Sequence, residues 1–410
     1  MLLLFDQIFG KMNKCRSQYL RRIQGIPSLY VQALILTSLS ISGCRTFYEP
    51  EIEKEDLGVL VVEGYLDSDG KKSELKLSRT TPLASSGEFF PEKGAFIQLR
   101  SDLGESFPLL EEREGVYVFE YTLESEQEYL LEIELANGEL FQSELLTPIS
   151  TPEILGVGFL KDEEGVEINV STQGNEQVND FLWTFQEDWI FRSYTQAGYI
   201  YDQETKSVRL RTAQEDIYTC YKTEPNPGIL LENSSRFQEQ VIFQKTITEI
   251  PLGDERLQAR YSILINQMGL PTEAVKFWEI LKKNTEDIGS IFSPLPSLIS
   301  GNIQAVNGDH PVIGQVLLGR VQQKRIYINL QDVSPWNHSN PEFFGCVVED
   351  TPLMIGTFDF HLAFGSGDYL PARAFPPEGL GPSGYYPVLS RCADCRLYAS
   401  KIKPEFWEDE

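Results

Sequence analysis

Residue types and motifs that build most active sites are scarce in this sequence. Its 410 residues include only three histidines, His310, His338 and His361. It has no Gly-x-Ser-x-Gly turn, no His-Glu-x-x-His pair and no glycine-rich phosphate loop, each of which marks a known type of active site. We therefore expect no catalytic residue, cofactor or metal, and the pattern favours binding over catalysis. A carboxylate pair for glycoside hydrolysis stays open, because 61 acidic residues produce many accidental pairs.

Positive charge is also scarce. The chain has 35 Lys and Arg against 61 Asp and Glu, a formal net charge of -26. Residues 1–43 hold five of the basic residues and one of the acidic ones, so 30 basic and 60 acidic residues follow them. A surface of this sign repels phosphate backbones. We expect no nucleic-acid partner.

The first 43 residues resemble a secretory signal peptide. An apolar segment over residues 26–41 is too short and too interrupted by Ser and Thr to remain in a bilayer. We predict that residues 1–43 are removed, with Met12 as an alternative start because residues 1–11 add nothing to such a signal. From Met12 onward, four basic residues precede the apolar segment: Lys14, Arg16, Arg21 and Arg22.

The apolar segment ends in Leu39-Ser40-Ile41-Ser42-Gly43-Cys44, which resembles the lipobox of bacterial lipoproteins. The thiol of Cys44 would receive the lipid, and each buried CH₂ of acyl chains such as palmitate contributes about 0.8 kcal/mol to membrane binding. Residues 44–57 then form a lipidated cysteine with an acidic tether. Because Arg45 replaces the Asp of an inner-membrane retention signal, we expect an outer-membrane protein facing the cell exterior.

The body of the chain reads as mainly β. Short alternating runs between residues 58 and 148, with an Asn137-Gly138 hairpin signal, predict an N-terminal β-sandwich of the immunoglobulin or transthyretin kind. The Pro-rich stretch at 147–152 marks the boundary. Residues 152–410 then form a larger β-rich domain with one amphipathic helix over 271–286, whose apolar stripe consists of Ala274, Phe277, Trp278 and Leu281.

Four cysteines remain in the body: Cys220, Cys346, Cys392 and Cys395. An exported chain meets an oxidising compartment, so an even number favours disulfides. We expect at least one bridge from Cys346 to Cys392 or Cys395. Two other interpretations of the Cys392-x-x-Cys395 pair stay open: it could be half of a zinc site, or it could be a redox motif.

Asp359 and His361 are the best candidates for a catalytic pair. Two residues apart, they would face one side of a strand, as an orienting carboxylate and a base would. A nucleophile is missing from this pattern. We therefore favour a simple surface pair over a catalytic one.

Several segments together resemble domain-of-unknown-function family 4249. Some lie around the predicted helix and others lie towards the two ends of the C-terminal domain. They are Trp183 with Glu187 and Trp189, Tyr261–Gln267, Phe277-Trp278, Gly289–Phe292 with Pro296, Gly301-Asn302-Ile303, Val312-Ile313-Gly314, Cys392-Ala393-Asp394-Cys395 and Pro404-Glu405-Phe406-Trp407. Relatives often have a Gly pair after the second tail cysteine, whereas this chain has Leu397-Tyr398-Ala399-Ser400.

The resemblance implies a lipoprotein of the Bacteroidetes, often encoded beside a TonB-dependent outer-membrane receptor. We therefore expect a non-enzymatic accessory of a TonB-dependent transporter that captures a nutrient, either a peptide or a glycan. Two alternatives stay open. One is an exported hydrolase that acts on a polymeric substrate, and the other is an outer-membrane assembly or adhesion factor.

Overall fold

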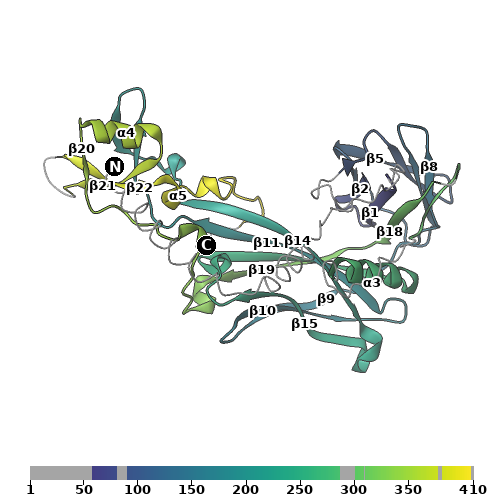
Figure 1. Ribbon diagram of the computed structural model, residues 1–410. Coiled ribbons are helices and arrows are strands. Elements are labelled where there is room, and N and C mark those ends of the chain that lie inside the picture. Colours follow the sequence, from purple (N-terminus) through teal and green to yellow (C-terminus); the bar gives the residue numbers. More distant parts are fainter. Residues whose placement is uncertain (1–57, 81–89, 287–300, 309, 377–380, 408–410) are drawn as a thin grey trace, which may run out of the picture. The chain divides into compact units, whose positions relative to one another are not determined.

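A computed structural model describes residues 58–80, 90–286, 301–308, 310–376 and 381–407 (Figure 1). The described chain is mainly β, as the sequence predicts. The predicted signal peptide, Cys44 and the acidic tether lie outside these residues. No helix among the described residues is long and apolar enough to cross a membrane.

The first sheet contains ten strands, in the order β17-β8-β7-β4-β5-β6-β2-β1-β18 with β3 paired to β2. Most strands alternate buried and exposed side chains, which is why they pair around one apolar core. The sheet extends beyond residues 58–148, because β17 and β18 come from the segment that we assigned to the C-terminal domain. The strands are β1 (Leu60–Asp67), β2 (Ser73–Arg79), β3 (Phe90–Pro91), β4 (Phe96–Ser101), β5 (Ser106–Arg113), β6 (Val116–Phe119), β7 (Tyr129–Glu134), β8 (Leu140–Ser143), β17 (Ile303–Ala305) and β18 (Val312–Gly319).

A seam at Asn302 joins the two ends of this sheet. The Asn302 side chain accepts a hydrogen bond from the Val316 amide (2.9 Å) and donates one to the Val316 carbonyl (2.7 Å). A Cβ atom at Gly301 would overlap the carbonyl group of Gly314, so this close approach requires glycine. The sheet therefore nearly closes on itself, which leaves few unpaired edge groups.

Two further sheets share the largest core. One has the order β14-β11-β16-β19 and the other β15-β10-β9 (Figure 1). Their facing side chains form a single buried cluster. Along β11, the odd-numbered residues from Phe181 to Phe191 point into that cluster, whereas Leu182 and Asp188 point to the opposite face. The strands are β9 (Ile154–Lys161), β10 (Gly165–Gln173), β11 (Asp180–Arg192), β14 (Thr219–Asn233), β15 (Val241–Pro251), β16 (Arg260–Leu270) and β19 (Gln322–Asn329).

Hydrogen-bonded polar groups fix the register inside this core. The indole of Trp183 donates to Gln267 (3.0 Å), whose amide group donates to the Pro152 carbonyl (2.8 Å). Glu187 accepts hydrogen bonds from Tyr261 and Arg256, each at 2.7 Å. Buried polar groups destabilise a fold unless they are hydrogen-bonded. A structural role therefore accounts for four residues of the family resemblance: Trp183, Glu187, Tyr261 and Gln267.

The predicted amphipathic helix is α3 (Thr272–Glu286). Ala274 and Phe277 are buried, and the helix packs with Leu182 of β11 and Leu317 of β18 in one cluster. The apolar stripe thus covers the end of the four-stranded sheet, as its spacing predicts.

Candidate binding surfaces

Two disulfides define a region that we call the disulfide lobe, residues 346–397. Cys346 is bonded to Cys392, and Cys220 is bonded to Cys395. The first bond is the bridge expected from the sequence. Because Cys392 and Cys395 bond to different partners, neither the zinc nor the redox interpretation of Cys392-x-x-Cys395 fits this structure. The lobe contains β20 (Leu353–Met354), α4 (Phe358–Ser366), β21 (Tyr369–Phe375), β22 (Gly384–Leu389), α5 (Ser390–Ala393) and the 3-10 helix η8 (Cys395–Leu397), and the hairpin of β12 (Tyr199–Asp202) and β13 (Ser207–Leu210) packs against it.

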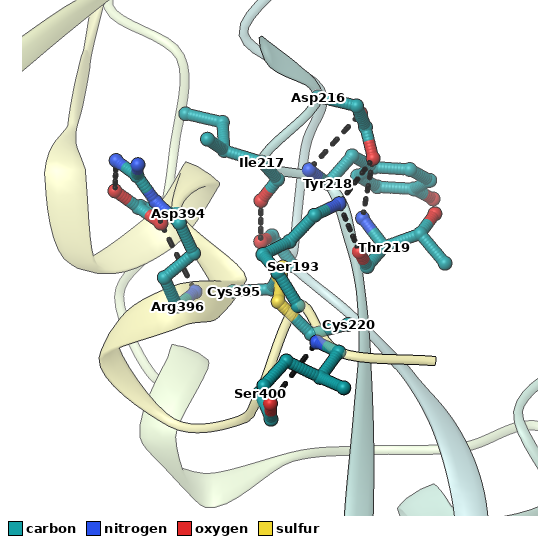
Figure 2. Close-up of a disulfide and its surroundings, with 12 residues drawn as sticks. Ser193, Asp216, Ile217, Tyr218, Thr219, Cys220, Asp394, Cys395, Arg396 and Ser400 are labelled. Atoms are coloured by element: carbon teal, nitrogen blue, oxygen red, sulfur yellow. Dashed lines mark hydrogen bonds and ion pairs between the residues drawn. A yellow bond between two sulfur atoms is a disulfide. The ribbon is translucent and has the colours of Figure 1, made fainter. Parts of the chain in front are cut away.

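The Cys220–Cys395 disulfide sits among backbone contacts that hold the lobe to β14 (Figure 2). The Cys395 amide donates to the Ile217 carbonyl (2.8 Å), and Asp216 accepts from the amides of Tyr218 and Thr219. The Asp394 carboxylate is bonded to the Arg396 guanidinium at 2.7 Å. The disulfide is therefore one part of a tightly connected junction.

After the lobe, the C-terminal tail lies on the outer face of the four-stranded sheet. Tyr221 and Ser400 exchange backbone hydrogen bonds of 2.8 and 3.0 Å. The Tyr327 hydroxyl donates to the Phe406 carbonyl (2.7 Å), and the Trp407 ring contacts the ring of Tyr221 edge-on at a centroid distance of 5.7 Å. The Pro404–Trp407 motif thus packs onto β14 and β19.

A buried ion pair lies beneath this tail. The Arg325 guanidinium bonds to the fully buried Asp188 carboxylate (2.9 Å) and to the Ser262 hydroxyl (2.9 Å), and its carbon lies 3.4 Å from the Phe406 ring centre. Asp188 also accepts a hydrogen bond from Thr223 (2.7 Å). Pairing on every side offsets the cost of removing these charges from water.

A cavity of about 500 Å³ opens beside Trp407. We call it the arginine cavity, because the described residues that line it include two arginines and two aromatic rings. The sequence analysis did not single it out, since its walls come from distant segments. Its lining residues are Ile190, Arg192, Tyr221, Ala259, Arg260, Asn329, Leu330, Gln331, Ser334 and Trp407.

The predicted Asp359–His361 strand is instead the helix α4. Thr357 caps its N-terminus by accepting a hydrogen bond from the Phe360 amide (3.2 Å), and Gly367 ends it in the left-handed conformation. Residues two apart on a helix point about 200° apart. The catalytic pair is therefore wrong: the Nδ1 atom of His361 lies 3.0 Å from the Tyr201 hydroxyl, whereas Asp359 lines a different surface.

The same helix is apolar on both faces. Phe360 and Phe364 are buried against Tyr385 and the hairpin, but Phe358 is 78% exposed and Leu362 is 59% exposed. A helix that is apolar all round is normally covered on all sides. We call the exposed side chains Met354, Ile355, Phe358 and Leu362 the α4 patch.

A second cavity, of about 550 Å³, adjoins Leu362 and has an acidic lining. Glu349, Asp359 and Asp368 contribute its charge, and the described residues that line it include no Lys or Arg. The apolar part of its wall comes from Leu353, Leu362, Ala363, Tyr369 and Pro387.

The other two histidines lie apart from this surface. His310 Nδ1 is 3.6 Å from Glu139, near the end of β8, and burial lowers the pKa of His338. Within the described ranges, no three His, Cys, Asp or Glu residues are grouped so that they could hold a metal ion. The structure therefore does not bring the three histidines together.

Comparison with known proteins identifies the family of this chain. Residues 45–325 match the model of the domain of unknown function DUF4249, and the chain belongs to that family. Among curated proteins, none matches the chain. A two-domain fibronectin type-III segment of chicken tenascin aligns with 52% of this chain and 90% of its own, at 12% identity and a TM-score of 0.15, which is too weak a likeness to carry an argument.

Proposed function

We propose that this protein is a lipid-anchored accessory of a TonB-dependent transporter, on the outside of the outer membrane. It binds both the transporter and a nutrient, a peptide or a glycan, and catalyses no reaction. The observation that carries this proposal is the α4 patch. Its four apolar side chains, of which Phe358 and Leu362 lie on α4, are not covered by the described chain.

The α4 patch has the properties of a protein-docking surface. Four large apolar side chains are exposed within nine residues of sequence, and Phe358 and Leu362 project from one side of α4 because they are four residues apart. The neighbouring cavity adds the carboxylates of Glu349, Asp359 and Asp368. A partner with basic residues around an apolar segment is complementary to this surface. A second copy of this acidic chain is not.

Membrane attachment rests on the lipobox. We propose that signal peptidase cuts before Cys44 and that the acyl chains on this residue hold the protein in the outer membrane. The Cys44→Ala variant should lose acylation and leave the membrane fraction, which fatty-acid labelling and fractionation would measure. Labelled Cys44→Ala protein would contradict the proposed anchor.

We also infer that the ten-stranded sheet is a sandwich of the immunoglobulin or transthyretin kind. In this arrangement β5 pairs with β4 on one side and with β6 on the other, so it links two layers. Support comes from the core, where Leu60 and Leu75 of one layer cluster with Ile97 and Leu131 of the other.

Affinity purification from solubilised outer membrane tests the docking role. The wild-type protein and a Phe358→Ser, Leu362→Ser double variant would be compared with Leu110→Ser, a control on β5 whose side chain is 69% exposed. We expect a β-barrel receptor to co-purify with the wild type and the control, and at least tenfold less receptor with the double variant. Equal recovery by all three proteins, or no receptor with any of them, would contradict the proposal.

Histidine substitution separates binding from catalysis. Replacing His310, His338 and His361 one at a time with Ala should leave the growth phenotype intact, because the proposed function uses no imidazole chemistry. If one change abolished growth on the nutrient without lowering stability or receptor recovery, the hydrolase alternative would gain support.

A further inference from the structure

We infer that a cavity between the β12–β13 hairpin and the disulfide lobe binds a ligand that carries a carboxylate next to an apolar side chain or a sugar ring. We call it the hairpin cavity, and its volume is about 360 Å³. This inference rests on the proposed nutrient capture and specifies the chemistry of the nutrient. The carboxylate comes either from the free C-terminus of a peptide or from an acidic sugar, and these two sources share the same recognition chemistry.

Arg211 is the residue that makes the hairpin cavity suitable for an anion, because it lines the cavity directly after the hairpin. Its Nε atom donates to the Ala197 carbonyl (3.0 Å), and one terminal nitrogen donates to the Glu215 carbonyl (3.3 Å). The other terminal nitrogen makes no hydrogen bond or ion pair within the part of the chain that the structure describes. A guanidinium that is oriented by two neutral groups can therefore bind an external carboxylate.

The carboxylates around Arg211 are neutralised by other basic residues. The segments that form the cavity, residues 195–220, 359–376 and 391–401, are described throughout, and their carboxylates that act on Arg211 are those of Glu215, Asp216 and Asp394. Each has its own basic partner: Glu215 pairs with Arg209 (2.7 Å), Asp216 with Lys401 (3.1 Å) and Asp394 with Arg396 (2.7 Å; Figure 2). The charge of Arg211 is left without a counterion of its own.

This single excess charge favours a carboxylate over a phosphate group. Burial and the nearby Arg396 lower the pKa of Arg211, as expected for a guanidinium without a close counterion. An anion with one negative charge compensates Arg211 completely. A phosphate group carries between one and two negative charges at neutral pH and would introduce an excess of negative charge.

The other lining residues define what accompanies the carboxylate. Tyr201, Phe364 and Tyr369 provide aromatic surface, and Gln203 and Gln214 provide hydrogen-bonding groups. Aromatic walls with a few polar groups are typical of small-ligand pockets. A volume of about 360 Å³ lies near the lower end of the usual range and suits one aromatic amino-acid residue or one sugar ring.

The walls of the hairpin cavity are held before a ligand arrives. The Arg211 amide donates to the Gly198 carbonyl (3.0 Å), and the Gly198 amide donates to the Ala372 carbonyl of β21 (3.3 Å). The Gln203 side chain donates to the Gly365 carbonyl of α4 (2.9 Å). These bonds connect the hairpin to two elements of the disulfide lobe. A preformed site loses little entropy on binding, which raises affinity.

Calorimetry on the full chain in detergent tests the inference. The probes are acetyl-phenylalanine with a free carboxylate, acetyl-phenylalanine amide, the methyl glycosides of glucuronic acid and of glucose, and inorganic phosphate. We expect one carboxylate probe to bind at least about tenfold more tightly than its neutral counterpart and than phosphate. The carboxylate probe that binds more tightly identifies the source. Equal affinity for charged and neutral probes, tighter binding of phosphate, or no binding of any probe would overturn the inference.

Two variants test the role of Arg211. Arg211→Met should weaken binding of the carboxylate probe at least about tenfold. Because Arg211 also bonds to two backbone carbonyls, Gln214→Glu provides a second test that leaves Arg211 in place. It adds a carboxylate to the cavity lining and should weaken binding at least about threefold. Unchanged affinity in either variant would overturn the inference.

Gln238→Glu is the matched control for Gln214→Glu. Both glutamines are exposed and lie in 3-10 helices, η2 (Ala213–Glu215) and η4 (Gln238–Gln240), but Gln238 does not line the hairpin cavity. Gln238→Glu should bind the carboxylate probe as the wild type does. An equal loss of affinity in both glutamate variants would contradict the assignment of the site.

Receptor recovery keeps this inference separate from the docking proposal. Arg211→Met should co-purify with the receptor as the wild type does, and the Phe358→Ser, Leu362→Ser double variant should bind the carboxylate probe normally. Receptor recovery without binding of any probe would overturn only the ligand inference. Probe binding without a receptor would overturn only the docking proposal.

Discussion

The ten-stranded sheet and the disulfide lobe reach stability by different means. The sheet closes its own seam through Asn302, buries one continuous apolar core and contains no cysteine in its strands. The lobe has short elements and two small clusters, and both disulfides of the described chain end in it. Small cores need covalent support.

The two regions also differ in how their apolar side chains are arranged. In the sheet, large apolar side chains such as Leu75, Ile97 and Leu131 point inward, and the outer face carries charged residues together with the exposed side chains of Phe96 and Leu110. In α4, apolar side chains are divided between the interior and the surface. A region stabilised by disulfides can keep such a face exposed for a partner without losing its fold.

Removing the Cys220–Cys395 disulfide should have the largest effect. The two cysteines are 175 residues apart, and loss of so long a cross-link is expected to cost about 3 to 5 kcal/mol. Hydrogen exchange of the Cys220→Ser, Cys395→Ser double variant should show reduced protection in the lobe and unchanged protection in β1, β2 and β18. Equal loss of protection in the lobe and in these three strands would contradict the proposed difference between the two regions.

The matched variant is the Cys346→Ser, Cys392→Ser pair, which opens a loop of 46 residues. It should cost about 1 kcal/mol less, because loop entropy grows slowly with length. A larger loss than in the first pair would contradict this ranking.

Phe360→Ala should come next and remain confined to the lobe. This side chain is 1% exposed and packs against Tyr201, Phe364 and Tyr385, so truncation is expected to cost about 3 kcal/mol. Chemical denaturation with local probes would measure it. If Phe358→Ala, on the exposed side of α4, were equally destabilising, the assignment of the two faces would be wrong.

Opening the seam should produce a smaller change in the other region. Asn302→Ala removes both hydrogen bonds to Val316 and is expected to cost about 2 kcal/mol, since the strand groups lose their partners. Exchange of the β18 amides should accelerate while the lobe is unaffected. Asn307→Ala, near the exposed end of β8, is the matched control with an expected cost of about 0.5 kcal/mol.

The smallest effect concerns alkaline pH. Burial, together with the Glu187 carboxylate, raises the pKa of Tyr261 above its usual value near 10. The unfolded chain therefore loses this proton first, and the stability contributed by Tyr261 is complete below about pH 10 and declines above it. Between about pH 10.5 and 11.5, the wild type should lose about 1.4 kcal/mol per pH unit more than Tyr261→Phe. Parallel stability curves would contradict this.

The sequence predicted the mainly β class and the helix α3, but it did not predict β14. That strand contains Pro225, Asn226 and Gly228, which normally indicate a loop. In the structure β14 is an edge strand of its sheet, where a missing backbone donor is tolerated. Whether a strand lies at an edge depends on the strand order of the sheet, which cannot be predicted from the local sequence.

The helix α4 was mistaken for a strand because its apolar residues alternate with Asp359 and His361. Apolar residues at every second position also occur in a short helix that is apolar on two opposite faces. The capping residues Thr357 and Gly367 distinguish the two, as the structure demonstrates.

The candidate site was predictable only in part. Four cysteines in an exported chain predicted disulfides, because the compartment and their even number limit the alternatives. The arginine cavity was not predicted, since Arg192, Tyr221 and Trp407 meet only through sheet register and the path of the tail.

The central claim is that the α4 patch docks onto a membrane partner. A photo-crosslinking amino acid placed at Phe358 in living cells tests this most directly, with Leu110 on β5 as the matched exposed position. We predict a crosslink from position 358 to a TonB-dependent β-barrel and none from position 110. Absence of a crosslink at 358, or equal crosslinks from both positions, would contradict the account.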